Sequence, residues 1–371
     1  MNYLFIILAF VISAFIARLI IPRILMISLR KKLFDMPDER KIHKRAIPRL
    51  GGVSFFPTIL FSCCVILALR TLTGYGIPVL PAVFILPECL LFICGMTLLY
   101  LTGIADDLIG VRYRQKFAIQ ILCACLFPIA GLWINDFYGL FGIYTIPKYI
   151  GIPFTVLTVV FITNAINLID GIDGLASGLS SVALLVLGAL FVEKGLWFYG
   201  MLAFSTVGVL VPFFYYNVFG SAERARKIFM GDTGSLTLGY ILSFLTIKYS
   251  QNNPEIISYT EGAFVIAFST LIIPSFDVIR VVLIRLRNGK NPFEPDKNHI
   301  HHKLLAIGLT PRKAMISLLF ISCAFSAVNI LFMPYINNTI MLLADIVIWI
   351  GLNLWWDRLR KKKQEKRSQL A

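Results

Sequence analysis

The segment Asn164-Ala-Ile-Asn167-Leu-Ile-Asp170-Gly-Ile-Asp173-Gly-Leu-Ala176 places two amides and two carboxylates between two long apolar runs. Each run, 151–168 and 173–192, has the length that a helix needs to cross the hydrocarbon core of a bilayer. A carboxylate at the edge of that core is costly unless it faces water, a cation or a polar partner, so it marks a candidate functional site. The alternative interpretation is a hydrated surface loop without a ligand.

The composition is that of a membrane protein. Of the 371 residues 58% are hydrophobic, and the mean hydropathy is +0.79. Soluble domains are about half apolar, so the bilayer is the expected solvent. The net charge of +15 lies in loops between apolar runs, and no nucleic acid partner is expected. The seven cysteines lack metal-binding spacing and are interpreted as small apolar residues.

The apolar runs predict an all-α, polytopic integral membrane protein with about 11 transmembrane helices. The first run is interpreted as an anchor and not as a cleaved signal peptide. Residues 1–356 are expected to form a single transmembrane domain, and 357–371 a basic cytoplasmic tail. The eleven runs are 2–22, 52–70, 83–103, 117–134, 151–168, 173–192, 197–216, 234–250, 261–284, 314–333 and 338–356.

The distribution of basic residues predicts the orientation. One set of loops, together with the tail, carries 28 Lys and Arg residues, and the opposite set carries four. Because cytoplasmic loops carry the excess of Lys and Arg, the N-terminus is predicted outside and the C-terminus in the cytoplasm. The four cations of the opposite set are Arg70, Lys148, Lys194 and Lys248.

Asp106 and Asp107 end the third apolar run, on the predicted cytoplasmic side. Neighbours on a helix point about 100° apart, so the two carboxylates cannot share one task from one face. One could act as a base or metal partner while the other orients it. The alternative is a solvated helix end, although acidic residues there oppose the helix dipole.

The segment Phe229-Met-Gly-Asp232-Thr-Gly-Ser235 precedes the eighth run and has the features of a phosphate or metal loop. Small residues leave backbone amides free at a helix N-terminus, and Asp232 supplies one hard oxygen ligand. Glycine-rich turns before helices are common, which is the alternative reading. The chain contains no Walker-type loop.

Two basic loops complete the predicted cytoplasmic face. His299-Ile-His301-His302 suggests contacts to a diphosphate; a three-histidine zinc site is the alternative, but adjacent histidines are awkward joint ligands. In the first loop, Asp35 to His43 and Pro48-Arg49-Leu-Gly-Gly52 are either a topology signal or an anion-binding wall.

Together these residues resemble the polyprenyl-phosphate N-acetylhexosamine-1-phosphate transferase superfamily, glycosyltransferase family 4. Its members move a sugar phosphate from a UDP-sugar to a lipid phosphate. The form Asn291-Pro-Phe-x-Pro-Asp296-x-x-His299-x-His301-His302 is similar to the WecA/TagO branch, which uses UDP-GlcNAc and undecaprenyl phosphate. The related MraY branch, which uses UDP-MurNAc-pentapeptide, has three consecutive histidines instead.

The resemblance implies a metal and an acceptor site. Asp232 and Asn167 would hold Mg²⁺, with Mn²⁺ as an alternative. Asp106 and Asp107 would lie beside the metal and activate the lipid phosphate, which Lys116 would bind.

The resemblance also implies a donor site. Phe229 would stack on uracil, and Asp173 would frame the base. His299, as a catalytic residue, would contact the diphosphate and sugar together with His301 and His302. Further substrate contacts are expected from Arg49, Asn164 and Asp170.

The expected function is transfer of GlcNAc-1-phosphate from UDP-GlcNAc to undecaprenyl phosphate, with release of UMP, at the cytoplasmic face of a bacterial inner membrane. The alternatives are transfer of phospho-MurNAc-pentapeptide or of another N-acetylhexosamine phosphate, and, from a different class, secondary transport. A transporter would place its polar groups near the midplane and show internal repeats, which this sequence lacks. A homodimer is a further expected partner state.

Overall fold

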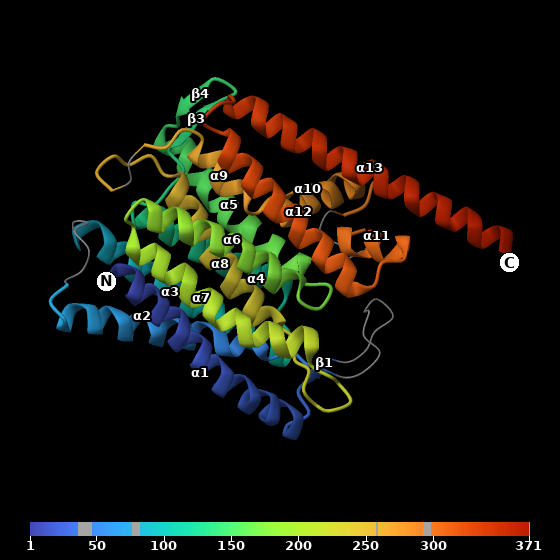
Figure 1. Cartoon of the computed structure of the whole chain (residues 1–371), viewed down its shortest axis with the longest axis horizontal. Helices are drawn as coiled ribbons and strands as arrows, with labels where there is room; N and C mark the ends of the chain where they lie inside the picture. Colours follow the sequence, from blue (N-terminus) through green and yellow to red (C-terminus); the bar gives the residue numbers. More distant parts are fainter. Residues whose placement is uncertain (36–46, 76–81, 257–258, 292–297, 371) are drawn as a thin grey trace.

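The structure is a computed structural model that describes residues 1–35, 47–75, 82–256, 259–291 and 298–370. It is a bundle of helices with two short β-hairpins (Figure 1). Several residues of the predicted loops lie outside the described residues, namely Asp38, Arg40, Lys41 and His43 in the first loop and Asp296 before the histidines.

The helices are α1 (Asn2–Arg30), α2 (Phe55–Leu72), α3 (Ala82–Ile109), α4 (Tyr113–Ile129), α5 (Lys148–Ile169), α6 (Leu175–Glu193), α7 (Trp197–Phe214), α8 (Gly231–Ser250), α9 (Ala263–Ser269), α10 (Ile272–Arg287), α11 (Ile300–Ile307), α12 (Pro311–Phe332) and α13 (Asn338–Leu370). A 3₁₀ turn, η1 (Gly51–Ser54), precedes α2, and a π-helical turn, η2 (Tyr215–Phe219), follows α7. The antiparallel pairs are β1 (Phe34–Asp35) with β2 (Ile47–Pro48), and β3 (Asp136–Leu140) with β4 (Ile143–Thr145).

Each of the eleven predicted runs contains a helix, but fewer helices are long and apolar enough to be identified as transmembrane spans from length and composition. Within the described residues eight meet that standard, and the pair α9 and α10, bent by 80°, makes a ninth. The helices α4 and α8 do not meet it. The prediction of a polytopic helical protein is therefore confirmed, whereas the count of eleven crossings stays a prediction.

The helix α8 is polar because protein, and not lipid, surrounds it. Every residue from Thr233 to Ser250 is buried, and the helix packs against α3, α5, α6 and α9. Its serine, threonine and glycine residues therefore face other helices, where small side chains permit close packing.

Three glycines bring the neighbouring helices and loops close to α8. A Cβ on Gly103 of α3 would lie 2.4 Å from the Thr233 Cα, and one on Gly239 would lie 2.6 Å from the Thr163 Cα of α5. In η1, a Cβ on Gly52 would lie 2.1 Å from the Gly234 nitrogen. Only glycine permits these approaches, which bring the ends of α3, α5 and η1 to the start of α8.

One cation of the predicted outer loops is buried in the bundle instead. Lys248 of α8 is fully buried and forms an ion pair of 2.6 Å with Glu88 of α3. The Tyr199 hydroxyl of α7 donates to the other Glu88 oxygen at 2.7 Å. The assignment of Lys248 to a loop was wrong because its buried partner, Glu88, is 160 residues away in the sequence and no local pattern reveals it.

The two ends of the bundle differ. Figure 1 shows β1 and α11 at one end and the hairpin of β3 and β4 at the other, and the N- and C-termini also lie at opposite ends. The helices α3 and α5 end at the α11 end, and α4 and α8 begin there. The polar residues that the sequence analysis selected are thus collected at one end of the molecule.

Candidate active site

The site is built on the first turn of α8, which carries Asp232. Gly231 begins the helix with φ of +72°, and a Cβ there would lie 2.1 Å from the Arg49 carbonyl oxygen. Both observations require glycine at this position. The helix N-terminus consequently meets the first loop and the end of α3 without a side chain between them.

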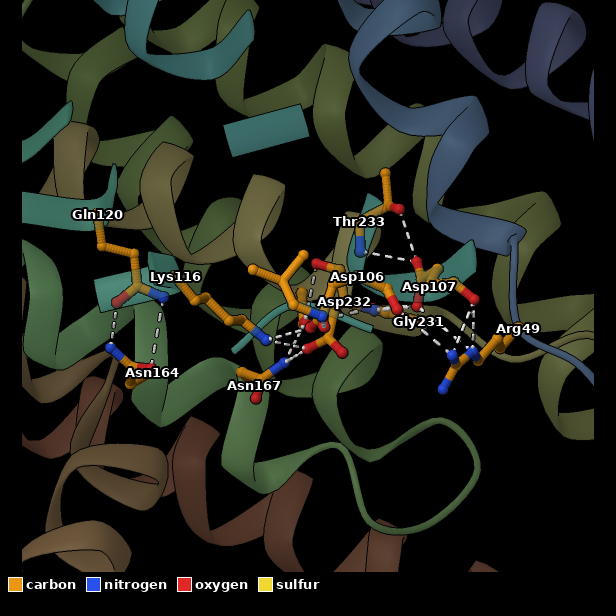
Figure 2. Close-up of polar contacts among 12 residues, drawn as sticks. Arg49, Asp106, Asp107, Lys116, Gln120, Asn164, Asn167, Gly231, Asp232 and Thr233 are labelled. Carbon is orange, nitrogen blue, oxygen red and sulfur yellow. Dashed lines mark hydrogen bonds and ion pairs between the residues drawn. The ribbon is translucent and has the colours of Figure 1, made fainter. Parts of the chain in front are cut away.

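Asp107 holds this helix start. Its Oδ1 accepts a hydrogen bond from the Asp232 nitrogen at 2.9 Å, and its Oδ2 accepts from the Thr233 nitrogen at 3.0 Å and hydroxyl at 2.6 Å (Figure 2). The side chain is fully buried. A carboxylate from another helix thus caps α8, and the charge favours the positive end of the helix dipole. Asp107 is the member of the pair that orients Asp232.

Asp106 points to a different group, as helical geometry requires. Its Oδ1 accepts from the Val111 nitrogen at 2.7 Å, and its Oδ2 accepts from Lys116 Nζ at 2.8 Å. Lys116 also donates to Asp232 Oδ1 at 2.7 Å, so one ammonium links two carboxylates from α3 and α8 (Figure 2).

Two amides of α5 lie on the same side of Asp232 as Lys116 (Figure 2). Asn167 donates to Asp232 Oδ1, and to the Ser235 hydroxyl at 2.8 Å. One turn earlier, Asn164 donates to Gln120 Oε1 at 2.5 Å. Gln120 of α4 was absent from the sequence prediction, because a glutamine within an apolar run gives no signal until its partner on another helix is known.

The first loop joins the site through its backbone. The Phe229 nitrogen donates to the Pro48 oxygen at 2.7 Å, and the Gly51 and Gly52 nitrogens donate to the oxygens of Phe229 and Met230. The Arg49 guanidinium donates to the Asp107 carbonyl oxygen at 2.8 Å and stays one-third exposed. Arg49 therefore lies at the site with its charge accessible.

A cavity of about 560 Å³ opens beside Asp232. Nine of the thirteen predicted site residues line it, namely Arg49, Asp107, Asn167, Asp170, Asp173, Phe229, Asp232, His301 and His302. The other four, Asp106, Lys116, Asn164 and His299, lie outside its lining. Lys116 pairs with Asp232, which lines the cavity, and with Asp106, which does not, so the Asp232 carboxylate connects the cavity to the Lys116 cluster.

Two lining residues were missed by the sequence analysis. Lys227 forms an ion pair of 2.5 Å with Asp173. Asn217, in the π-helical turn η2, accepts from the Gly174 nitrogen at 2.6 Å and donates to the Ile228 oxygen at 2.9 Å. It ties the loop after α5 to the loop before α8, a role that π-helical turns often have at functional sites. Both depend on contacts between distant segments.

Asp170, at the end of α5, is exposed to the cavity but surrounded by protein. Burial raises its pKa to about 7, and the charges of Asp232, Asp173 and Asp107 act in the same direction. A concentration of carboxylates that raises a pKa is typical of a site that binds a cation.

His301 packs against Gly171, whose added Cβ would lie 2.1 Å from the imidazole Nε2. Burial, together with the neighbouring His302 and His299, lowers the pKa of His301 to about 3. The ring is therefore neutral near pH 7 and can form hydrogen bonds but carries no charge. Its Nδ1 has no hydrogen-bond partner within the described part of the chain.

The donor atoms favour a hard cation over zinc. The described residues contain no group of three His, Cys, Asp or Glu side chains placed to hold a metal, so the zinc alternative finds no support in them. Asp232 and Asn167 instead offer a carboxylate and an amide beside the cavity. Mg²⁺ prefers oxygen ligands and keeps several waters, so this pair fits it.

Comparison with known proteins agrees with this arrangement. Residues 89–250 match the model of the family described as Glycosyl transferase family 4. The chain is 30% identical over 348 residues to a probable undecaprenyl-phosphate N-acetylglucosaminyl 1-phosphate transferase of Bacillus subtilis (strain 168), covering 94% of this chain and 87% of the relative.

Two further relatives carry a closely similar name, undecaprenyl-phosphate alpha-N-acetylglucosaminyl 1-phosphate transferase. The Yersinia pestis protein is 28% identical, covering 92% of this chain and 90% of its own length. The Escherichia coli (strain K12) protein is 28% identical, covering 90% and 88%. The similarity therefore extends beyond the family match to the loops that carry Arg49 and the histidines, and the chain belongs to glycosyl transferase family 4.

Proposed function

We propose that the protein transfers GlcNAc-1-phosphate from UDP-GlcNAc to undecaprenyl phosphate. The products are undecaprenyl diphosphate GlcNAc and UMP. The names of the relatives support this donor sugar and acceptor over phospho-MurNAc-pentapeptide and other N-acetylhexosamine phosphates. The reaction would be the first membrane step in the synthesis of a cell-surface glycan, such as a cell-wall polymer or lipopolysaccharide.

The position of Asp232 is the observation that supports this proposal most strongly. Its carboxylate lines a cavity large enough for a sugar nucleotide and pairs with a lysine at the start of α4 that lies outside the cavity lining. Two phosphorylated substrates that repel each other must meet in line, so catalysis requires positioning and charge neutralisation more than a strong nucleophile. The donor would occupy the cavity, and the acceptor phosphate would approach from the Lys116 side.

The cavity offers groups for each part of the donor. Phe229 would provide an aromatic face for uracil, and the ion pair of Asp173 and Lys227 belongs to the same lining. Neutral His301, together with His302, would form hydrogen bonds to the diphosphate. Arg49 supplies an accessible positive charge at the same cavity.

We further propose Mg²⁺ as the cofactor, with Mn²⁺ as a substitute, held by Asp232 and Asn167. Bound there, the ion would neutralise charge on the diphosphate. Asp107 would keep Asp232 in place for it, since the Asp107 carboxylate fixes the backbone of the same helix turn.

The contacts of Asp106 and Asp107 favour a single displacement. An oxygen of the lipid phosphate attacks the β-phosphorus, a new P–O bond forms, and the bond from this phosphorus to the bridging oxygen breaks as UMP leaves. A covalent aspartyl intermediate would need a free carboxylate oxygen facing the donor. Both Asp107 oxygens accept hydrogen bonds from α8, and Asp106 does not line the cavity.

We place the enzyme in a bacterial inner membrane with this site on the cytoplasmic face, because the basic loops surround the site end of the bundle. UDP-sugars are soluble, and a site at one end of the bundle is open to them. The N-terminus would then be outside and the C-terminus in the cytoplasm.

The test is an assay of purified protein with radiolabelled UDP-GlcNAc, undecaprenyl phosphate and Mg²⁺, in which UMP and labelled lipid are measured together. We expect both in equal amounts, and none with the Asp232→Asn variant or without the lipid. UDP-MurNAc-pentapeptide in place of UDP-GlcNAc tests the alternative donor. Uptake of a solute into proteoliposomes without UMP release would support a transporter and contradict the proposal.

A further inference from the structure

A carboxylate outside every predicted motif is buried behind the histidines. Asp277, in α10, has a fully buried side chain. Its Oδ2 lies 2.9 Å from His299 Nδ1, and its Oδ1 accepts from Arg280 at 2.7 Å. A buried charge is costly unless it is paired and hydrogen-bonded, so this carboxylate has defined partners that hold it in place.

The first consequence concerns His299. With Nδ1 donating its hydrogen to the Asp277 carboxylate, the orientation of the ring is fixed, and Nε2 of the neutral ring is an acceptor. His299 does not line the cavity, but its ring lies parallel to that of His301, with centroids 6.0 Å apart and an interplanar angle of 3°.

The second consequence concerns the start of α11. The N-cap residue His299 gives its own helix no side-chain cap. Asp277 Oδ1 accepts from the Ile300 nitrogen at 3.0 Å instead, and Arg280 donates to the Asn298 carbonyl oxygen. The unsatisfied amide at a helix start thus receives its acceptor from α10. The segment from Asn298 to Ile300 is thereby anchored to α10.

The other end of α11 is held by a different element. Lys363 of α13 donates to the Ile307 carbonyl oxygen at 2.8 Å, and Lys303 pairs with Asp357 of α13 at 3.0 Å. The end that enters the cavity with His301 and His302 is therefore the one that Asp277 fixes.

We propose that Asp277 is a positioning residue of the transferase: through His299 and the Ile300 amide it sets the place of His301 and His302 at the diphosphate end of the donor cavity. This proposal rests on the proposed function. It assigns Asp277 no contact with substrate. Its effect should therefore appear where the histidines act, on the diphosphate, and leave the uridine end of the cavity unchanged.

The experiment compares Asp277→Asn with the wild type in competition assays against UDP-GlcNAc, with UDP and uridine as inhibitors. Asparagine keeps the shape of the side chain but cannot satisfy three donors with an anion. We expect UDP to inhibit at least tenfold more weakly and uridine to inhibit within twofold of the wild type. The KM for undecaprenyl phosphate should stay unchanged.

Two further variants make the outcome decisive. Asp345→Asn is the matched control, since Asp345 is also a buried carboxylate with an amide partner, Asn329, but lies outside the cavity; its UDP inhibition should equal that of the wild type. Combining Asp277→Asn with the double variant His301→Gln/His302→Gln should weaken UDP inhibition little beyond the double variant alone, because Asp277 acts through those two residues.

The results that would contradict the positioning role differ from the one that would contradict the proposed function. Unchanged UDP inhibition in folded Asp277→Asn, or equal losses for UDP and uridine, would overturn the positioning role. If that variant fails to fold, His299→Gln, which removes the ring but leaves the Asp277 bond to Ile300, must show the same selective loss of UDP inhibition. Failure of the wild type to recognise UDP at all would refute the proposed function instead.

Discussion

At the scale of single residues, Asp106 and Asp107 show how adjacent carboxylates divide two tasks. The sequence predicts the division, since neighbours on a helix point apart, but it does not predict which residue has which task. The structure shows Asp107 bound to the backbone of α8 and Asp106 bound to Lys116. That assignment depends on the crossing of α3 and α8 at Gly103, which no local pattern reveals.

Asp107→Asn should therefore lower stability more than Asp106→Asn does. An asparagine at 107 presents one NH₂ group to backbone donors, and leaving a buried donor unsatisfied costs about 1–3 kcal/mol. Asp106 is partly exposed, and its variant should keep the wild-type unfolding temperature while UMP release falls. The measurement is thermal unfolding in detergent beside the UMP assay. Equal unfolding temperatures for both variants would contradict the capping role of Asp107.

His301 should make stability depend on pH. Its pKa is lowered to about 3 in the folded protein, whereas an unfolded histidine has about 6.5. Between these values the unfolded chain binds the extra proton, so the stability present above about pH 6.5 is lost as the pH falls toward 3. Asp170, whose pKa is raised to about 7, has the opposite effect. Between about pH 4 and 7 the folded chain binds the extra proton, so its contribution to stability grows as the pH falls.

The His301→Gln variant isolates the histidine contribution, because Asp170 is present in both proteins. We expect the fall in unfolding temperature from pH 7 to pH 5 to be smaller in this variant than in the wild type, or to become a rise. A fall of the same size would show that folding does not lower the pKa of His301.

At the scale of elements, α8 explains both a success and a failure of prediction from the sequence. The loop before it is recognisable because glycines and a carboxylate precede a helix, which is local information. The burial of α8 on all sides is not local, and neither are the partners of Gln120, Asn217, Lys227 and Asp277. Such residues become interpretable only once segments far apart in sequence are placed together.

The ion pair of Glu88 and Lys248 should be a major contribution to the packing of α8. Removing one partner leaves an uncompensated charge among apolar helices, so Lys248→Met should destabilise the protein by about 3–5 kcal/mol. Glu88→Gln combined with Lys248→Met removes both charges and should recover most of this loss. Denaturant unfolding of the detergent-solubilised variants measures it. A single variant as stable as the wild type would show that the pair contributes nothing.

At the scale of the whole molecule, α4 and α8 connect the two ends although neither meets the length and apolarity of a recognised span; α4 has only 17 residues. Each begins at the site, near Lys116 and Asp232. The end of α8 leads to Asn252, which bonds to Asn135 and Asp136 beside the far hairpin. Together with the nine segments of the described residues that qualify as spans, α4 and α8 would account for eleven crossings, and an odd number agrees with termini at opposite ends.

The orientation of this bundle gives the last prediction. Arg224 lies exposed in the loop before α8 at the site end, and Tyr144 is 62% exposed in the hairpin at the other end. Since 28 Lys and Arg residues lie in the segments on the site side against four in the opposite set, one of which, Lys248, is buried, we expect Arg224→Cys to face the cytoplasm. A membrane-impermeant thiol reagent should label it in inverted vesicles and not in spheroplasts, and Tyr144→Cys should show the reverse.

The native cysteines require a parallel wild-type control. Labelling of Arg224→Cys in intact spheroplasts would place the site outside, where UDP-sugars from the cytoplasm could not reach it, and would contradict both the topology and the proposed donor.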